Sequence, residues 1–173
     1  MRVNILDIPN EGLEIVQEFK FEDFMLLEKN SYFLGPAQVK IKITKKAEKA
    51  IIEGQIFTQI SLICSRCLSD YTMEINSSFN LVYYPMEQFL SEELKEKELR
   101  EKDLESLYYR NNELNIDSII LEQINLSIPL KPICSENCKG LCEICGVNLN
   151  IKSCGCELKA KNHFFDKIKL NIK

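Results

Sequence analysis

The sequence has a single histidine, His163, and no apolar run that approaches the eighteen or so residues of a membrane helix. Its first residues, MRVNILDIPNEG, lack the basic leader and apolar segment of a secretory signal. No Ser–His–Asp set, phosphate-binding loop or pair of catalytic carboxylates stands out. We therefore expect a cytoplasmic protein that is not an enzyme and has no membrane contact and no small-molecule substrate.

The cysteines are the feature that points most directly at chemistry. Two of the eight form a CxxC pair, and the other six lie in one stretch some seventy residues later. In a reducing compartment, closely spaced cysteines bind metal or do redox work rather than form disulfides. Zinc prefers four thiolates in a tetrahedron. The sequence therefore predicts one or two structural zinc ions, with the ligands Cys64, Cys67, Cys134, Cys138, Cys142, Cys145, Cys154 and Cys156.

The spacing leaves the partition of these cysteines open. Cys142-x₂-Cys145-Gly146 has the form of a zinc knuckle, and Cys154-Gly155-Cys156 closes a local four-thiolate site with it. The first four cysteines then form a second site that staples the tail to the strands. The alternatives are a site made of the middle four cysteines, or a single metal with the remaining thiols free and buried.

Redox chemistry is the rival use of these cysteines. Cys138-x₃-Cys142-x₂-Cys145 has the spacing of a radical-enzyme iron–sulfur cluster, but the chain after Cys145 is too short to build the barrel of those enzymes. A rubredoxin-like iron site also suits CxxCG knuckles. A thiol oxidoreductase at Cys64 and Cys67 is disfavoured, because redox CxxC pairs open a helix and a strand pattern follows here.

Alternating apolar residues predict a series of strands before residue 86. The face that carries Ile52, Ile56 and Ile60 is apolar over much of its length, and Gly54 within it marks a bulge or a close backbone approach. The CxxC pair then lies at a tight turn between two strands. The strands are predicted at 3–8, 13–19, 39–44, 50–63 and 71–83.

A helix is predicted over residues 116–128, where apolar residues recur at helical spacing. Asn115 or Asp117 caps its start, and Pro129 and Pro132 forbid its continuation. The fold class is α+β: an antiparallel β-rich block with a C-terminal helix and a cysteine-rich zinc-knuckle tail. The predicted parts are a β-rich block (1–85), a charged insert or linker (86–114), and the helix with the zinc-binding tail (115–173), packed on the block as one domain.

The net charge of −4 excludes a uniformly basic nucleic-acid coat. Lysines nevertheless concentrate in residues 37–49 and 152–173, on either side of an acidic middle. Two interpretations stay open. The tail phenylalanines Phe164 and Phe165 stack on bases beside the lysines, or they belong to the core and the lysines are only solvated. The sequence assigns no RNA-binding residue.

The segment from Leu126 to Cys156 reads LSIPLKPICxxxCKGLCxxCGxNLNxxxCxC. With Cys64-x-Arg66-Cys67-Leu68 and the opening Asp7-Ile8-Pro9, it closely resembles the YceD-like family, the large ribosomal RNA subunit accumulation proteins of bacteria and plastids. The charged stretch 87–113 looks expanded relative to that family, and the tail 162–170 follows its ending only loosely.

This resemblance implies a non-enzymatic factor for accumulation of the large-subunit (23S) ribosomal RNA. Its implied partner is the ribosomal RNA precursor or a ribosome assembly factor. Net acidity favours an alternative, a protein–protein adaptor without RNA contact, and the lysine clusters favour RNA. A small metal or thiol redox protein is the third hypothesis.

Overall fold

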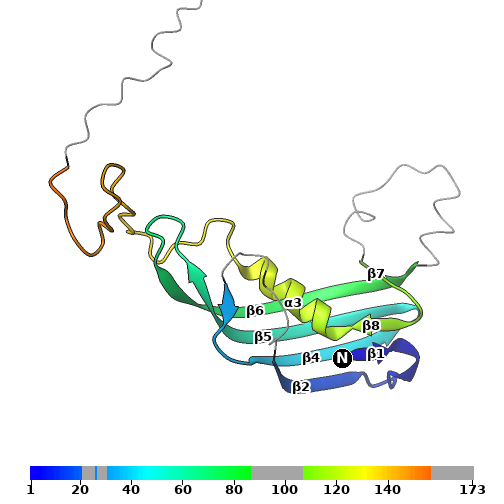
Figure 1. The fold of residues 1–173 in the computed structure, drawn as a ribbon. Helices are drawn as coiled ribbons and strands as arrows, with labels where there is room; N and C mark the ends of the chain where they lie inside the picture. Colours follow the sequence, from blue (N-terminus) through cyan, green and yellow to red (C-terminus); the bar gives the residue numbers. More distant parts are fainter. Residues whose placement is uncertain (21–25, 27–30, 87–106, 157–173) are drawn as a thin grey trace, which may run out of the picture.

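A long sheet with one helix across it makes up most of the structure (Figure 1). The computed structural model describes residues 1–20, 26, 31–86 and 107–156. Most of the charged insert, residues 21–25 and 27–30, and the tail with Phe164 and Phe165 lie outside these described residues. The strands are β1 (Arg2–Asn4), β2 (Leu13–Phe19), β3 (Tyr32–Phe33), β4 (Ala37–Lys46), β5 (Lys49–Ile63), β6 (Asp70–Pro85), β7 (Leu107–Tyr109) and β8 (Glu113–Asn115).

The main sheet has the order β2-β4-β5-β6-β7, and β3 pairs with β5 off this path. Strands β4, β5 and β6 form a meander in which β5 and β6 pair from Ala50 with Tyr83 to Ile63 with Asp70. The pairs are antiparallel as predicted, except that β7 lies parallel to β6. A second, two-stranded sheet joins β1 to β8.

Two predicted boundaries differ from the structure. Residues 107–115, most of which we placed in the charged insert, form β7 and β8, so that end of the insert pairs with the sheets. The strand predicted at 3–8 stops at Asn4 and continues as a 3₁₀ turn, η1 (Ile5–Asp7). Here the Asn4 side chain accepts a hydrogen bond from the Leu6 N–H at 2.9 Å and turns the backbone out of the strand.

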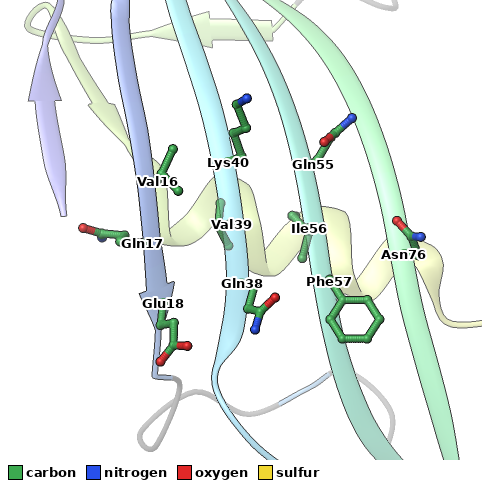
Figure 2. A pocket seen from close by; sticks show the side chains of 10 residues that line it. All are labelled: Val16, Gln17, Glu18, Gln38, Val39, Lys40, Gln55, Ile56, Phe57 and Asn76. Atoms are coloured by element: carbon green, nitrogen blue, oxygen red, sulfur yellow. The ribbon is translucent and has the colours of Figure 1, made fainter.

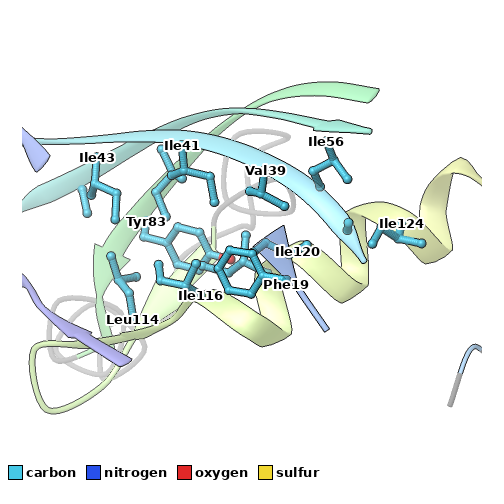
Figure 3. Packing of buried hydrophobic residues seen from close by; sticks show 14 of the residues in the cluster. Phe19, Val39, Ile41, Ile43, Ile56, Tyr83, Leu114, Ile116, Ile120 and Ile124 are labelled. Carbon is cyan, nitrogen blue, oxygen red and sulfur yellow. The ribbon is translucent and has the colours of Figure 1, made fainter. Parts of the chain in front are cut away.

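Side-chain alternation gives the main sheet one buried and one exposed face. Along β4 and β5 the residues alternate between buried and exposed for most of their length, as the sequence pattern predicts. The buried face packs against the helix α3 (Ile116–Ser127), as Figure 3 shows for Val39, Ile41, Ile120 and Ile124. Each fully buried isoleucine contributes roughly 1.5–3 kcal/mol relative to an exposed one.

The helix begins and ends where the sequence predicts. The Asn115 side chain accepts a hydrogen bond from the Ser118 N–H at 3.3 Å, and Ile128 ends the helix just before Pro129. Four isoleucines at helical spacing (Ile116, Ile119, Ile120 and Ile124) are buried. No helix in the described ranges has the length and apolar character needed to cross a membrane.

Gly54 lies on the buried face of β5, opposite Phe79 of β6. A Cβ atom at Gly54 would lie 2.2 Å from Cζ of Phe79, so the phenylalanine ring occupies the space that a side chain would need. The close approach inferred from the sequence is therefore between this backbone and an aromatic ring.

We predict that Gly54→Ala destabilises the fold by about 1–3 kcal/mol, because the added methyl group displaces the Phe79 ring from a packed face. Urea unfolding measures the change. Gly35→Ala is the matched control, since a Cβ there meets nothing within 4 Å. Equal midpoints for both variants would contradict the packing described here.

Candidate metal centres

The first thiol group joins two parts of the chain that are far apart in sequence. Cys64 and Cys67 lie on the turn between β5 and β6, and Cys134 and Cys138 lie in the segment after α3. The turn is held by hydrogen bonds from the Leu68 N–H to the Cys64 carbonyl and from the Cys64 N–H to the Ser69 carbonyl, both at 2.9 Å. Leu68 adopts a positive φ of 57° to close it.

The four sulfur atoms of this group have the spacing of a tetrahedral metal site. They all lie within 4.8 Å of one another, and the Cys64–Cys138 and Cys67–Cys134 sulfur pairs are both 3.8 Å apart. Four sulfurs placed about 2.3 Å from one zinc ion are separated by roughly 3.8 Å. The same distance is far too long for a disulfide, which needs about 2.05 Å. The residues present therefore fit a zinc ion.

Burial and hydrogen bonding shift the pKa values of the first group's thiols in different directions. Cys64, Cys67 and Cys138 are buried beside Tyr71, whereas Cys134 is exposed. Burial opposes ionisation of Cys64, but hydrogen bonds from the backbone of Cys67, Cys134 and Arg66 outweigh it and lower its pKa to about 6. The hydrogen bond with Cys138, together with desolvation, raises the pKa of Cys134 to about 12. A bound dication would remove the repulsion between such neighbouring thiolates.

The second thiol group is local. Cys142, Cys145, Cys154 and Cys156 also bring their sulfurs within 4.8 Å of one another. The Gly146 N–H donates to the Cys142 carbonyl at 2.8 Å, with Gly146 at a φ of +72°, and these two features close a turn at the CxxCG sequence. Backbone hydrogen bonds from Cys145 and Ile144 lower the pKa of Cys142 to about 6.

The structure thus arranges the eight cysteines in the first of the partitions considered from the sequence. The two groups differ in exposure: in the second group only Cys142 is buried, and Cys145 and Cys156 are exposed. Four thiolates are soft ligands that suit zinc and also suit iron. A site closed by four protein ligands leaves no position for water or substrate, and such sites are structural.

The comparison with known proteins agrees with the cysteine pattern. Residues 52–170 match the model of a family described as the large ribosomal RNA subunit accumulation protein YceD. The chain belongs to the YceD family. Because the match runs from β5 to beyond both thiol groups, all eight cysteines lie within the shared region.

Curated relatives of the chain come from plants and bacteria. It is 30% identical over 146 residues to the chloroplastic large ribosomal RNA subunit accumulation protein YCED homolog 1 of Arabidopsis thaliana. The aligned region covers 73% of this chain and 46% of the relative. The maize protein of the same name is 28% identical over 147 residues, 73% of this chain and 50% of the relative. An uncharacterized Mycobacterium leprae protein is 20% identical over 119 residues, 68% and 51% of the two chains. The chain spans about half the length of these relatives, and no solved structure matches it significantly.

Arg66, between Cys64 and Cys67 and within the region that matches the YceD family, holds the two halves of the first group together. Its guanidinium donates to the carbonyls of Glu136 and Cys138 at 3.1 and 3.2 Å. The Arg66 carbonyl also accepts from the Leu141 N–H at 3.2 Å.

Gly140 is the reason that the backbone of the tail can approach Arg66 so closely. A Cβ at Gly140 would lie 3.1 Å from the Arg66 carbonyl oxygen, and Gly140 also has a φ of +73°. Both the space and the backbone conformation therefore favour glycine in the Cys-Lys-Gly-Leu-Cys motif.

Two asparagines of the YceD motif connect the second group to the first, a role that the sequence did not reveal. The Asn150 amide donates to the Cys138 sulfur at 3.3 Å, and its oxygen accepts from the Lys139 N–H at 2.8 Å. The Asn148 amide donates to the Ser69 hydroxyl at 3.0 Å, and its oxygen accepts from the Asn150 N–H. Polar side chains that hydrogen-bond to metal ligands fix the orientation of those ligands.

We predict that the purified chain binds two zinc ions, and that Cys64→Ser and Cys145→Ser each lower the content to one. Elemental analysis measures the metal. Cys64→Ser also exposes residues 132–141 to protease, because the first group attaches that segment to the sheet, whereas Cys145→Ser leaves it protected. A metal-free chain that is equally resistant to protease would contradict the assignment.

We predict that Arg66→Met speeds zinc release from the first group to a chelator about tenfold. Loss of a residue that orients metal ligands weakens metal binding by roughly 10- to 100-fold, and tenfold is the lower end of that range. Lys131→Met is the matched control, because Lys131 is an exposed cation just before Cys134. Equal rates of zinc release from both variants would show that Arg66 does not position the metal ligands.

Proposed function

We propose that this protein acts in production of the large ribosomal subunit. It is a non-enzymatic, cytoplasmic factor that promotes accumulation of 23S ribosomal RNA by contacting the rRNA precursor or an assembly factor. The observation that carries the proposal is membership, over residues 52–170, of the YceD family, which is described as a large ribosomal RNA subunit accumulation protein.

The thiol groups support a structural use of zinc in this role. The segment after α3 carries exposed apolar residues and few buried ones, so apolar burial contributes little to its order. Metal binding by the cysteines supplies the missing stabilisation, as in small zinc-dependent modules. The ions therefore fix the position of the tail on the β5–β6 turn, and take no part in catalysis.

A second candidate function is a protein–protein adaptor without RNA contact. The cysteine-rich end exposes several large apolar side chains: Leu68 is 65% exposed, Ile144 58% and Ile151 83%. Large apolar side chains that stay exposed in one cysteine-rich segment and on the turn it contacts are available for protein contact. This observation favours an assembly factor as the partner of that end.

Depletion of the protein in cells tests the proposal. We expect the ratio of 23S to 16S ribosomal RNA to fall, with restoration by the wild-type gene and by Lys131→Met. Cys64→Ser is expected to restore it poorly, because the tail is no longer held on the sheet. An unchanged ratio after verified depletion would overturn the proposed function.

Ultraviolet cross-linking in growing cells separates the two ways of acting. Enrichment of large-subunit RNA or its precursor on the protein identifies a direct RNA contact. No enrichment, with the protein abundant and intact, identifies the adaptor instead.

A further inference from the structure

The face of the main sheet that points away from α3 is covered by none of the described elements. Figure 2 shows part of it, with Lys40, Gln55 and Phe57 on the side opposite the helix. Two large apolar side chains on this face remain exposed: Val16 is 71% exposed and Phe57 41%. Antiparallel sheets commonly leave one face to solvent, but that face is then polar.

One end of this face carries two lysines and two tyrosines in a row across four strands. Lys46 of β4 and Lys49 of β5 stand directly opposite each other, and Tyr84 of β6 is the register partner of Tyr108 of β7. The Lys49 ammonium lies 4.8 Å from the centre of the Tyr84 ring. The two tyrosine rings are 6.4 Å apart and inclined by 48°.

The lysine pair is electrostatically unfavourable in the protein alone, because like charges directly opposite on neighbouring strands repel each other. Among the described residues, no carboxylate forms an ion pair with Lys46 or Lys49. The turn that joins them is also fixed in place, since the Tyr109 hydroxyl donates to the Glu48 carbonyl at 2.8 Å. A pair of lysines on a fixed turn, with no carboxylate partner among the described residues, is suited to an anion.

Further along the same face lies a hollow of about 420 Å³. Amide side chains from three strands line it, namely Gln38, Gln55 and Asn76, together with Lys40 and the exposed Phe57 (Figure 2). Amides donate and accept hydrogen bonds at once, as the edges of nucleobases do, and an exposed aromatic ring offers a stacking surface.

From this arrangement we propose that the uncovered face of the sheet binds single-stranded RNA. Lys46 and Lys49 contact phosphates, Tyr84 and Tyr108 stack on bases, and the hollow at Phe57 receives a further base. The proposal rests on the proposed function and names the surface through which the chain would contact the rRNA precursor.

The aromatic rings, rather than the charges, favour RNA over an acidic peptide as the occupant. Between the two ends, Glu14 and Glu53 flank Lys42 in the strand register, and Glu14 lies 4.0 Å from its ammonium. This acidic middle repels carboxylates and phosphates alike, so the charges do not choose between the two polyanions. A single strand of RNA gains base stacking at the rings, which is worth about a tenfold change in affinity or more for each base.

A direct binding measurement tests the proposal. The probe is a fluorescent 12-nucleotide RNA of mixed sequence, a length within the site sizes of single-strand binders, which run from about 4 to 16 nucleotides. For the full chain we expect the double variant Lys46→Ala/Lys49→Ala to weaken binding. It should also lower the slope of log K against log salt by about 1.4, because two phosphate contacts are lost.

Two further comparisons isolate the stacking contribution. Tyr84→Leu is expected to weaken binding about tenfold, whereas Tyr84→Phe keeps the ring and binds as the wild type does. Urea unfolding of each variant confirms that the sheet is intact. Lys131→Ala/Lys152→Ala removes the same charge at the cysteine-rich end, and we expect it to leave the affinity unchanged.

The outcomes distinguish this site from the function on which it rests. Equal RNA affinity of the wild type, Lys46→Ala/Lys49→Ala and Tyr84→Leu would overturn the proposed RNA-binding site, even if depletion still lowers 23S RNA. Tighter binding of poly-glutamate than of the RNA probe would also overturn it. A normal 23S to 16S ratio after depletion would overturn the proposed function, whatever the chain binds in solution.

Discussion

The meeting of Cys64 and Cys67 with Cys134 and Cys138 is the contact on which the position of the whole cysteine-rich segment depends. The long β5–β6 hairpin ends at the CxxC turn, and backbone hydrogen bonds across the junction are few, such as that from the Ser65 N–H to the Pro132 carbonyl at 2.8 Å. Four sulfurs at tetrahedral spacing suit a metal ion, and metal–thiolate bonds are far stronger than those hydrogen bonds. The asparagines then transmit this order to the second thiol group.

The sheet gives the molecule two different surfaces. One face is buried by α3, and its isoleucines pack with those of the helix in one core, so its residues are explained by packing alone. The opposite face is not needed for that core, yet it retains the exposed side chains of Val16 and Phe57, opposed lysines and a hollow lined by amides. Residues that cost stability without contributing to packing are most readily explained by binding.

Regular patterns in the sequence predicted the long strands and the helix well, but they did not predict the short strands or the irregular contacts. The alternation over 39–44 and 50–63 locates β4 and β5, and the isoleucine spacing with Asn115 locates α3. The strands β7 and β8 have three residues each, too few for any period, and they form because β6 and β1 lie beside them. In the candidate site, cysteine spacing suggested the groups, but it did not choose among partitions. That choice needed the distance between the β5–β6 turn and the segment after α3.

The use of thiols at one end of the molecule has a consequence for the apolar residues around them. In an ordinary small domain, Leu68, Ile144 and Ile151 would be buried to hold the segment in place. Metal ligation by the cysteines would remove that need, and in the structure these side chains are exposed around the two thiol groups. A rigid backbone with exposed apolar tips loses little conformational entropy when a partner covers it. The cysteine-rich end is therefore suited to protein contact and the uncovered sheet face to RNA. Contact with an assembly factor and contact with the rRNA precursor, the two routes within the proposed function, would then use different surfaces of the molecule.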